Sequence, residues 1–111
     1  MGFFKNRTAR LFNESLMKAE QGIPEFQLIV ADMYREGAGT VPNMQEAISW
    51  YKEASNNGNI EATYKLGVAY FKGDSVSVDI DKGIEYVELA AKGGSKMAIK
   101  TLPNMRLLQQ R

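Results

Sequence analysis

The sequence contains neither cysteine nor histidine among its 111 residues. Without cysteine the chain has no disulfide framework and no thiolate nucleophile, a composition that fits a reducing compartment. Without histidine it has no serine–histidine triad and none of the usual zinc sites. We therefore expect a protein that is not an enzyme and that needs no metal or cofactor.

Long apolar stretches are also missing. No run approaches the roughly 20 apolar residues that a helix needs to span a bilayer. The opening residues 1–6 are too few and too soon charged for a secretory signal. These absences predict a cytoplasmic protein of ordinary globular composition, with 44% apolar and 24% charged residues.

Two short motifs that suggest ligands are incomplete. Asp74, Asp79 and Asp81 form the best carboxylate cluster, but the glycine and the spacing of a calcium loop are missing. The glycine-containing segment 37–39 begins like a nucleotide-binding turn, yet no strand-like sequence precedes it. Neither motif predicts a metal or nucleotide site.

Charge is unevenly distributed along the chain although the net charge is only +1. Residues 1–18 carry four basic and one acidic side chain, and residues 19–91 carry five basic and twelve acidic. Residues 92–111 carry five basic and no acidic side chains. Such an arrangement could steer a polar partner or let copies stack end to middle, whereas the simpler interpretation is two solvated ends.

Nucleic acid and membrane are not the partners that the sequence favours. Five basic residues near the C-terminus could touch phosphates, but no base-stacking platform or recognised reading motif accompanies them. An amphipathic membrane contact near the N-terminus has equally little support, because Phe3 and Phe4 are expected to pack as a short arm against the first helix. The basic set is Lys92, Lys96, Lys100, Arg106 and Arg111, and the N-terminal set is Phe3, Phe4, Lys5, Arg7 and Arg10.

The chain repeats itself at a spacing of 36 residues. Residues 23–58 align without a gap on residues 59–94, and the identities fall where a helical hairpin is punctuated or packed. A fixed period in this range is typical of a helical stack in which each unit buries its apolar face on its neighbour. The identical pairs are Glu25/Glu61, Tyr34/Tyr70, Gly37/Gly73, Ile48/Ile84, Ala54/Ala90 and Gly58/Gly94.

The same segments contain residues that predict where helices begin and end. Side chains that can cap a helix N-terminus stand at Thr8, Asn43, Asn59, Asp79 and Ser95. Pro24 suits a first helical position, and Gly22, Gly37, Gly58, Gly73 and Gly94 suit the left-handed residue that ends a helix. The predicted helices are 8–21, 24–36, 44–57, 60–72, 80–93 and 95–102, with a tail to about 108.

Apolar residues follow helical spacing within each unit. Small residues at Ala31/Gly67, Ala47/Gly83 and Ala54/Ala90 should let two helix axes come close, while large aromatic residues fill the adjoining grooves. We therefore assign the aromatic side chains to packing rather than to ligand contact. They are Tyr34, Trp50, Tyr70 and Tyr86.

These residues resemble a known family. The stretch from Ala62 to Gly73 reads A-T-Y-K-L-G-V-A-Y-F-K-G, and the stretch from Val76 to Gly94 ends in E-L-A-A-K-G-G. That pattern is similar to the Sel-one-like (SLR) repeat, a relative of the tetratricopeptide repeat. The first unit departs from it with Phe26 in place of alanine and Ala31 in place of glycine, which implies looser hairpin packing.

The resemblance implies an all-α fold, a short right-handed α-solenoid of antiparallel helix hairpins. Within one domain of residues 1–111 we expect an N-terminal arm and helix (1–21), two full repeats (22–58 and 59–94), and a partial repeat with a tail (95–111). Pro103 replaces the glycine that follows Leu102, so the last helix should kink or stop there and act as a truncated cap. Two full repeats are near the minimum for a stable stack, which leaves dimerisation through an end helix open.

The family resemblance also implies a binding surface, because the first helix of each hairpin lines a concave groove in tetratricopeptide-like stacks. Charged residues should begin this groove, an apolar and aromatic centre should follow, and basic residues should end it. The alternative is that Tyr64 and Phe71 merely cover the neighbouring hairpin. The predicted groove residues are Asp32, Arg35, Tyr64, Val68, Phe71, Lys72 and Lys100.

The leading functional hypothesis is a non-catalytic adaptor that binds a partner protein or peptide in this groove. A narrower version, resting on the family and the small size, is a bacterial immunity or antitoxin-like protein that inhibits one enzyme. Two other classes stay open: a weak hydrolase or binding protein for cell-wall fragments, and a self-assembling structural protein. The sequence names no partner.

Overall fold

The computed structural model describes residues 2–110, with side chains from Arg7 onward. Six α-helices and no strands occur in this part of the chain, which confirms the all-α class. The chain divides into two compact units, Met1–Asn59 and Ile60–Arg111, and each contains three helices.

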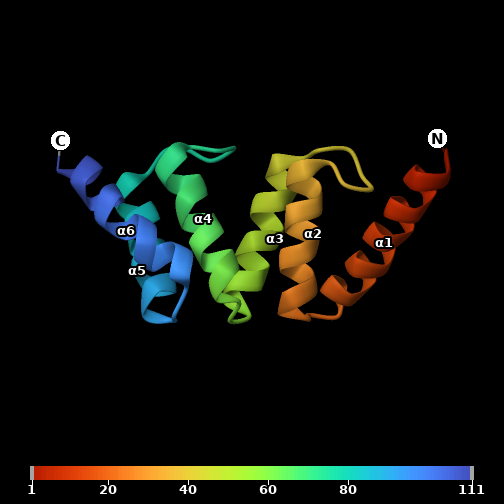
Figure 1. Ribbon diagram of the computed structural model, residues 1–111, viewed down its shortest axis with the longest axis horizontal. Coiled ribbons are helices and arrows are strands. Elements are labelled where there is room, and N and C mark those ends of the chain that lie inside the picture. The colour runs from red at the N-terminus through yellow and green to blue at the C-terminus, as the bar shows by residue number, and fades with distance from the viewer. Residues whose placement is uncertain (1, 111) are drawn as a thin grey trace. The chain divides into compact units, whose positions relative to one another are not determined.

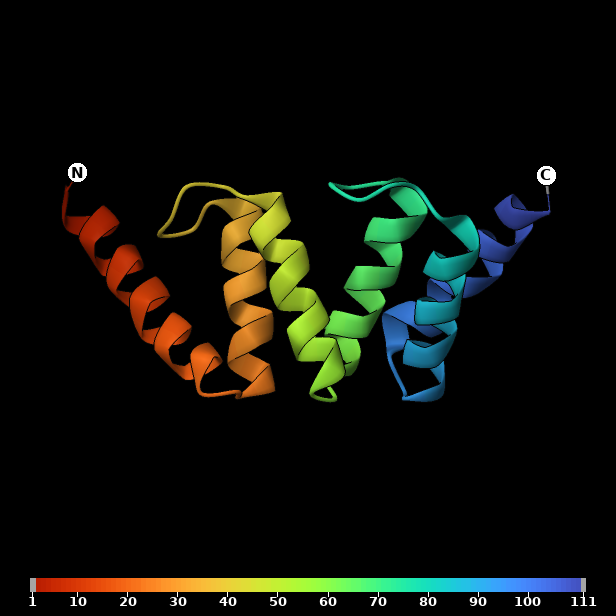
Figure 2. The same cartoon turned by 180° about the vertical axis from the view of Figure 1, so that it is seen from behind.

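The first unit contains α1 (Gly2–Glu20), α2 (Pro24–Glu36) and α3 (Met44–Asn56). α2 and α3 form an antiparallel hairpin, and α1 approaches α2 near the turn that joins them before diverging toward its own N-terminus (Figures 1 and 2). Phe12, Ala19 and Val30 form a buried cluster there, against which Tyr34 and Trp50 pack. The ring of Phe12 meets the ring of Tyr34 edge to face, with centroids 5.1 Å apart.

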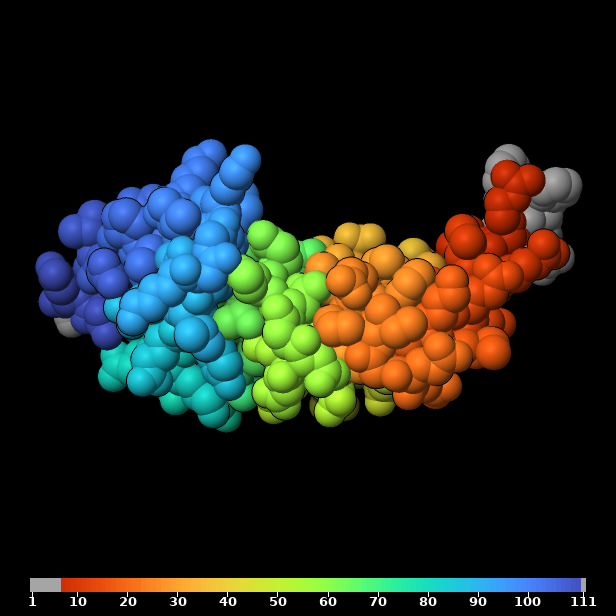
Figure 3. All heavy atoms as spheres, turned by 90° about the horizontal axis from the view of Figure 1, so that it is seen from below, coloured from red at the N-terminus to blue at the C-terminus, as the bar shows by residue number. Residues whose placement is uncertain are grey.

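The second unit contains α4 (Ile60–Lys72), α5 (Ile80–Lys92) and α6 (Lys96–Gln109). α4 and α5 form the hairpin, and α6 packs on α5 (Figure 1). One cluster of buried side chains in this unit comes from α5 and α6 and consists of Ile84, Val87, Ala90, Ala98, Leu102 and Met105. In the space-filling view of Figure 3, α5 and α6 lie side by side as blue atoms.

Local signals set most helix ends, as predicted. The side chains of Asn43, Asp79 and Ser95 accept hydrogen bonds from backbone N–H groups three residues later, at 3.1, 3.0 and 3.2 Å. Each bond satisfies an N–H group that has no partner within the helix. Pro24 stands at the start of α2, and all five glycines predicted as helix ends have positive φ angles.

The hairpin of the second unit is packed very closely. A Cβ atom added to Gly83 would lie 2.7 Å from the carbonyl oxygen of Gly67, and one added to Gly67 would lie 2.8 Å from that of Gly83. These distances are too short for any side chain. The first unit has Ala31 and Ala47 at the same positions, both fully buried, so its hairpin accepts a methyl group on each helix.

Two of the predicted boundaries are wrong. α1 begins at Gly2, so Thr8 lies inside the helix rather than capping it, and residues 2–7, which were expected to form an arm, are helical. α6 continues through Pro103 to Gln109 instead of ending near residue 102. Pro103 is exposed, whereas Leu102 and Met105 on either side of it are buried, and their burial holds the helix together across the lost hydrogen bond. The predicted packing of Phe3 and Phe4 falls outside the side chains that the structure describes.

Candidate binding surfaces

The predicted groove residues of the first unit belong to a polar cluster between α2 and α3. The hydroxyl group of Tyr51 donates a short hydrogen bond of 2.5 Å to the carboxylate of Asp32. Arg35 lies 3.8 Å from the same carboxylate and 3.2 Å from that of Glu36. Tyr51 is almost fully buried, whereas the side chain of Asp32 is 28% exposed. The buried tyrosine therefore holds in place a carboxylate that is partly exposed to solvent.

Burial and the hydrogen bond to Asp32 keep the Tyr51 hydroxyl protonated. Burial is the larger cause, and both raise the pKa of Tyr51 far above its usual value. The second repeat lacks this pair, because Val68 and Val87 stand at the positions equivalent to Asp32 and Tyr51. A hydrogen-bonded pair in one hairpin thus corresponds to two valine positions in the other.

The tyrosines before the two long loops also differ in their neighbours. In both hairpins a backbone N–H group at the end of the loop donates a hydrogen bond to the carbonyl oxygen of the tyrosine. Asn43 donates to Tyr34 at 2.8 Å, and Asp79 donates to Tyr70 at 2.9 Å. Burial first, and the nearby carboxylate of Glu46 second, raise the pKa of Tyr34. Lys82 stands at the equivalent position in the second hairpin, and its Nζ atom lies 4.7 Å from the ring centre of Tyr70.

A buried glutamine that the sequence did not reveal joins all three helices of the first unit. Gln27 is 2% exposed. Its Nε2 atom donates to the carbonyl oxygen of Ala19 at the end of α1, at 3.1 Å, and its Oε1 atom accepts from Asn57 after α3, at 2.9 Å. Both amide atoms are therefore used. The equivalent residue in the second repeat is the buried Thr63.

Replacing Gln27 with leucine should lower the free energy of unfolding by about 2 kcal/mol, because the carbonyl group of the buried Ala19 loses its donor and the side-chain amide of Asn57 loses its acceptor. Trp50 is the single tryptophan and lies in the same unit, so its fluorescence during urea unfolding is the measurement. Gln45→Leu at an exposed position of α3 is the matched control and should change the free energy by less than about 0.5 kcal/mol. Equal effects of the two variants would contradict a structural role of the Gln27 amide.

The predicted groove residues of the second unit lie mainly on α4. Tyr64 and Phe71 are half-buried and pack against the α5–α6 cluster, in agreement with the alternative in which they cover the neighbouring helices. Val68 is half-buried between them, and Lys72 and Lys100 are exposed. Since Asp32 and Arg35 lie in the other unit, the joint groove stays a prediction.

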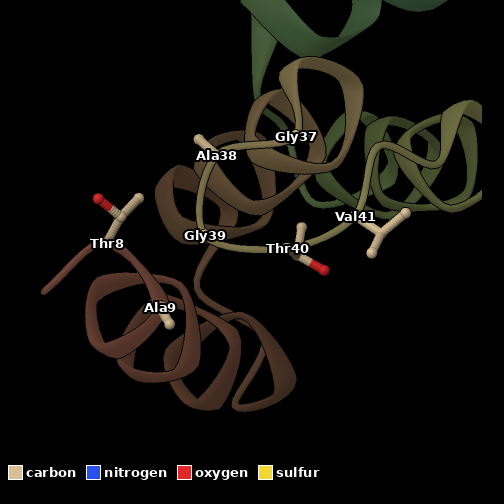
Figure 4. Close-up of a pocket in the computed structure, with 7 residues that line it drawn as sticks. All are labelled: Thr8, Ala9, Gly37, Ala38, Gly39, Thr40 and Val41. Atoms are coloured by element: carbon tan, nitrogen blue, oxygen red, sulfur yellow. The ribbon is translucent and has the colours of Figure 1, made fainter. Parts of the chain in front are cut away.

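The first unit contains an apolar pocket that the sequence did not indicate. It has a volume of about 630 Å³ and lies between the N-terminal half of α1 and the loop that follows α2 (Figure 4). The loop reaches α1 at Gly39, where an added Cβ atom would lie 2.4 Å from the carbonyl oxygen of Thr8. Gly39 also has a φ angle of 75°, so glycine is needed here for two reasons. The lining residues are Thr8, Ala9, Gly37, Ala38, Gly39, Thr40 and Val41.

The described residues contain neither a metal-binding cluster nor a membrane-spanning helix. No group of three or more acidic side chains in this part of the chain is placed to hold a metal ion. None of the described helices combines the length and the apolar character needed to cross a membrane.

Comparison with known proteins explains the repetition. The Sel1 repeat model matches residues 24–59 and again residues 60–95. The chain belongs to the Sel1 repeat family. Each match covers one hairpin, α2–α3 or α4–α5, together with the turn that follows it. Sel1 repeats generally mediate protein–protein interactions and are typically non-catalytic scaffolds, which agrees with the coarse function predicted from the sequence.

Solved Sel1 repeat structures have the same fold. The Sel1 repeat protein from Oxalobacter formigenes aligns with 86% of this chain at a TM-score of 0.82 and 24% identity. A protective antigen of uropathogenic Escherichia coli strains, which displays an SLR fold, aligns with 87% of the chain at a TM-score of 0.84 and 29% identity. This chain spans 39% and 21% of those two proteins.

One curated relative comes from yeast. Activator of C kinase protein 1 of Saccharomyces cerevisiae is 28% identical over an alignment of 99 residues that covers 85% of this chain. The match covers only 16% of the yeast protein, so most of that protein has no counterpart in this Sel1 repeat chain.

Proposed function

We propose that this Sel1 repeat protein is a non-catalytic interaction module that binds a partner protein or peptide. The binding surface consists of the solvent-exposed faces of α2 and α4, the first helices of the two repeats, and of α6. The observation that carries the proposal is the pair of Sel1 repeats over residues 24–95. A repeat of this family buries its conserved pattern in packing, so the residues that select a partner are those left on the surface.

The surface of the second unit supports this function. Met97 and Leu108 on α6 are 49% and 48% exposed. Their spacing is about three turns of 3.6 residues, so the two side chains lie on one face of the helix. Exposed large apolar residues that share a face are a common feature of protein-binding sites.

Met97→Glu/Leu108→Glu should reduce partner capture at least about tenfold, because two charges on an apolar contact cost more than 1.4 kcal/mol in binding. We would isolate partners from a lysate of the source organism with tagged protein and quantify them by mass spectrometry. Leu89→Glu on α5 is the matched control, since Leu89 is 60% exposed and lies on a second helix. Equal capture by all three proteins would contradict the proposal.

Tyr64 and Phe71 are less suitable for this test. Both pack against the α5–α6 cluster, so alanine at either position would remove buried contacts as well as surface. A single dominant partner in a one-to-one complex would favour the inhibitor form of the proposal, whereas several weakly bound partners would favour a general adaptor.

A further inference from the structure

We propose that the face formed by α4 and α6 in the second unit binds an acidic peptide segment with apolar anchor residues. The inference rests on the proposed function and names the chemistry of the partner. It is drawn entirely within one compact unit, Ile60–Arg111, and on side chains that the structure describes.

The two helices turn equivalent faces to the same side of the unit. Their buried faces, which include Leu66 on α4 and Leu102 on α6, contribute to the core that also contains α5. α6 aligns with α4 after a shift of 36 residues. Equivalent positions of the two helices therefore form the face that points away from the core. On α4 this face carries Glu61, Val68 and Lys72, with Tyr64 at its edge, where it packs against the α5–α6 cluster, and on α6 it carries Met97, Lys100, Asn104 and Leu108.

Apolar anchors and cations alternate on this face. Val68 is half-buried, and Met97 and Leu108 are about half exposed, so these three side chains offer apolar surface to a partner. Lys72 and Lys100 are exposed, and neither makes an ion pair with a residue that the structure describes. Apolar contacts supply most affinity in such interfaces, and charges at the rim select the partner.

Charge separates between the helices of the unit. α6 carries Lys96, Lys100 and Arg106 and no acidic residue, and α4 carries Glu61 against Lys65 and Lys72. Most acidic residues of the unit's helices lie on α5, which carries Asp81, Glu85 and Glu88 against Lys82 and Lys92. Arg106 is partly neutralised by Glu88, at 2.7 Å, on the side that faces α5. The face itself carries Lys72 and Lys100 against Glu61, so its net charge is positive, and a complementary partner is anionic.

A protein segment suits this face better than a nucleic acid or a membrane. Tyr64 and Phe71 pack against the core, so they do not offer free ring faces for bases to stack on. Met97 and Ile99 are both exposed but point to different sides of α6, because residues two apart do not share a helix face. The exposed apolar residues thus form no single stripe that could lie in a bilayer surface.

Three fluorescein-labelled synthetic peptides test the inference by fluorescence anisotropy. All three have phenylalanine and leucine at the same positions and differ only in their polar residues, which are glutamate, glutamine or lysine. We expect the glutamate peptide to bind at least about tenfold more tightly than the lysine peptide at low salt, with the difference shrinking at about 0.3 M salt. Lys72→Glu/Lys100→Glu should weaken the glutamate peptide about tenfold, whereas Arg10→Glu, an exposed charge reversal in the first unit, should change it less than twofold.

Each other outcome overturns the inference in a distinguishable way. Equal binding of the three peptides would mean that the face recognises apolar residues alone, and the proposed function would survive without the acidic partner. Binding of none at up to millimolar protein would count against both. Tighter binding of single-stranded DNA or of phosphatidylserine vesicles than of the glutamate peptide, lost in Lys72→Glu/Lys100→Glu, would assign the face to those ligands. Circular dichroism of each variant checks that the fold is retained.

Discussion

Replacing Gly83 with valine should lower the free energy of unfolding by about 2–3 kcal/mol. A Cβ atom at this position would lie 2.7 Å from the carbonyl oxygen of Gly67 and 2.8 Å from the backbone nitrogen of Phe71. Both contacts are with backbone, so they can be relieved only by moving α4 away from α5. Such overpacking costs about 1–3 kcal/mol, and the better helix propensity of valine returns only a few tenths of a kcal/mol. Urea unfolding followed by circular dichroism is the measurement.

A second glycine near the same hairpin supplies the control. A Cβ atom at Gly93 would lie 2.8 Å from Cδ1 of Ile60, which is the flexible end of a side chain. Gly93→Ala should therefore change the free energy of unfolding by less than about 1 kcal/mol. A Gly83→Val variant that is no less stable than Gly93→Ala would show that the helices are not held at this separation.

Replacing Asp32 with valine should cost about 2 kcal/mol, although valine is the residue that the second repeat has at this position. The substitution removes the carboxylate that accepts the hydrogen bond of Tyr51, a nearly fully buried residue. A buried donor that loses its acceptor costs about 1–3 kcal/mol. The free energy is best measured from the fluorescence of Trp50, which lies in the same unit.

The double variant Asp32→Val/Tyr51→Phe should recover most of that loss, to within about 1 kcal/mol of the original protein, because both partners are then apolar. The two changes together test the interaction rather than either side chain alone. If the double variant were as unstable as Asp32→Val, the loss would have to come from packing, and the hydrogen bond would not be the cause.

Much of the fold follows from residues that act on their immediate neighbours. Asn43, Asp79 and Ser95 cap the helices that start after them, and Gly37 and Gly73 end the first helix of each hairpin, all within a few residues of their partners. Such signals can be interpreted from the sequence because the groups that interact are close along the chain. Their recurrence after 36 residues identified the repeat.

The same local rules fail where tertiary packing dominates. Proline alone predicts that α6 stops near Pro103, but burial of Leu102 and Met105 keeps the helix intact to Gln109. Thr8 is a good capping residue in isolation, yet α1 already contains it. In both places tertiary contacts, which the sequence does not display, outweigh the local preference of a single residue.

The sequence also does not predict which side chains form pairs between helices. The hydrogen bonds of Asp32 and Gln27 are not predictable from the sequence, because their partners Tyr51, Ala19 and Asn57 lie on other helices or just beyond them. One signal was available: the positions of Asp32 and Tyr51 change together to valine in the second repeat. Two differences between aligned repeats do not, however, reveal that the side chains touch.

The contact between Asp32 and Tyr51 also limits the order in which one repeat can evolve toward the other. If valine replaced Asp32 first, the intermediate would carry a buried hydroxyl group without the carboxylate, whereas phenylalanine at position 51 would leave a carboxylate that is 28% exposed and still hydrated. The second order passes through the more stable intermediate. Since a protein with few repeats has little stability to spare, drift between these two hairpins should proceed through the aromatic position before the acidic one.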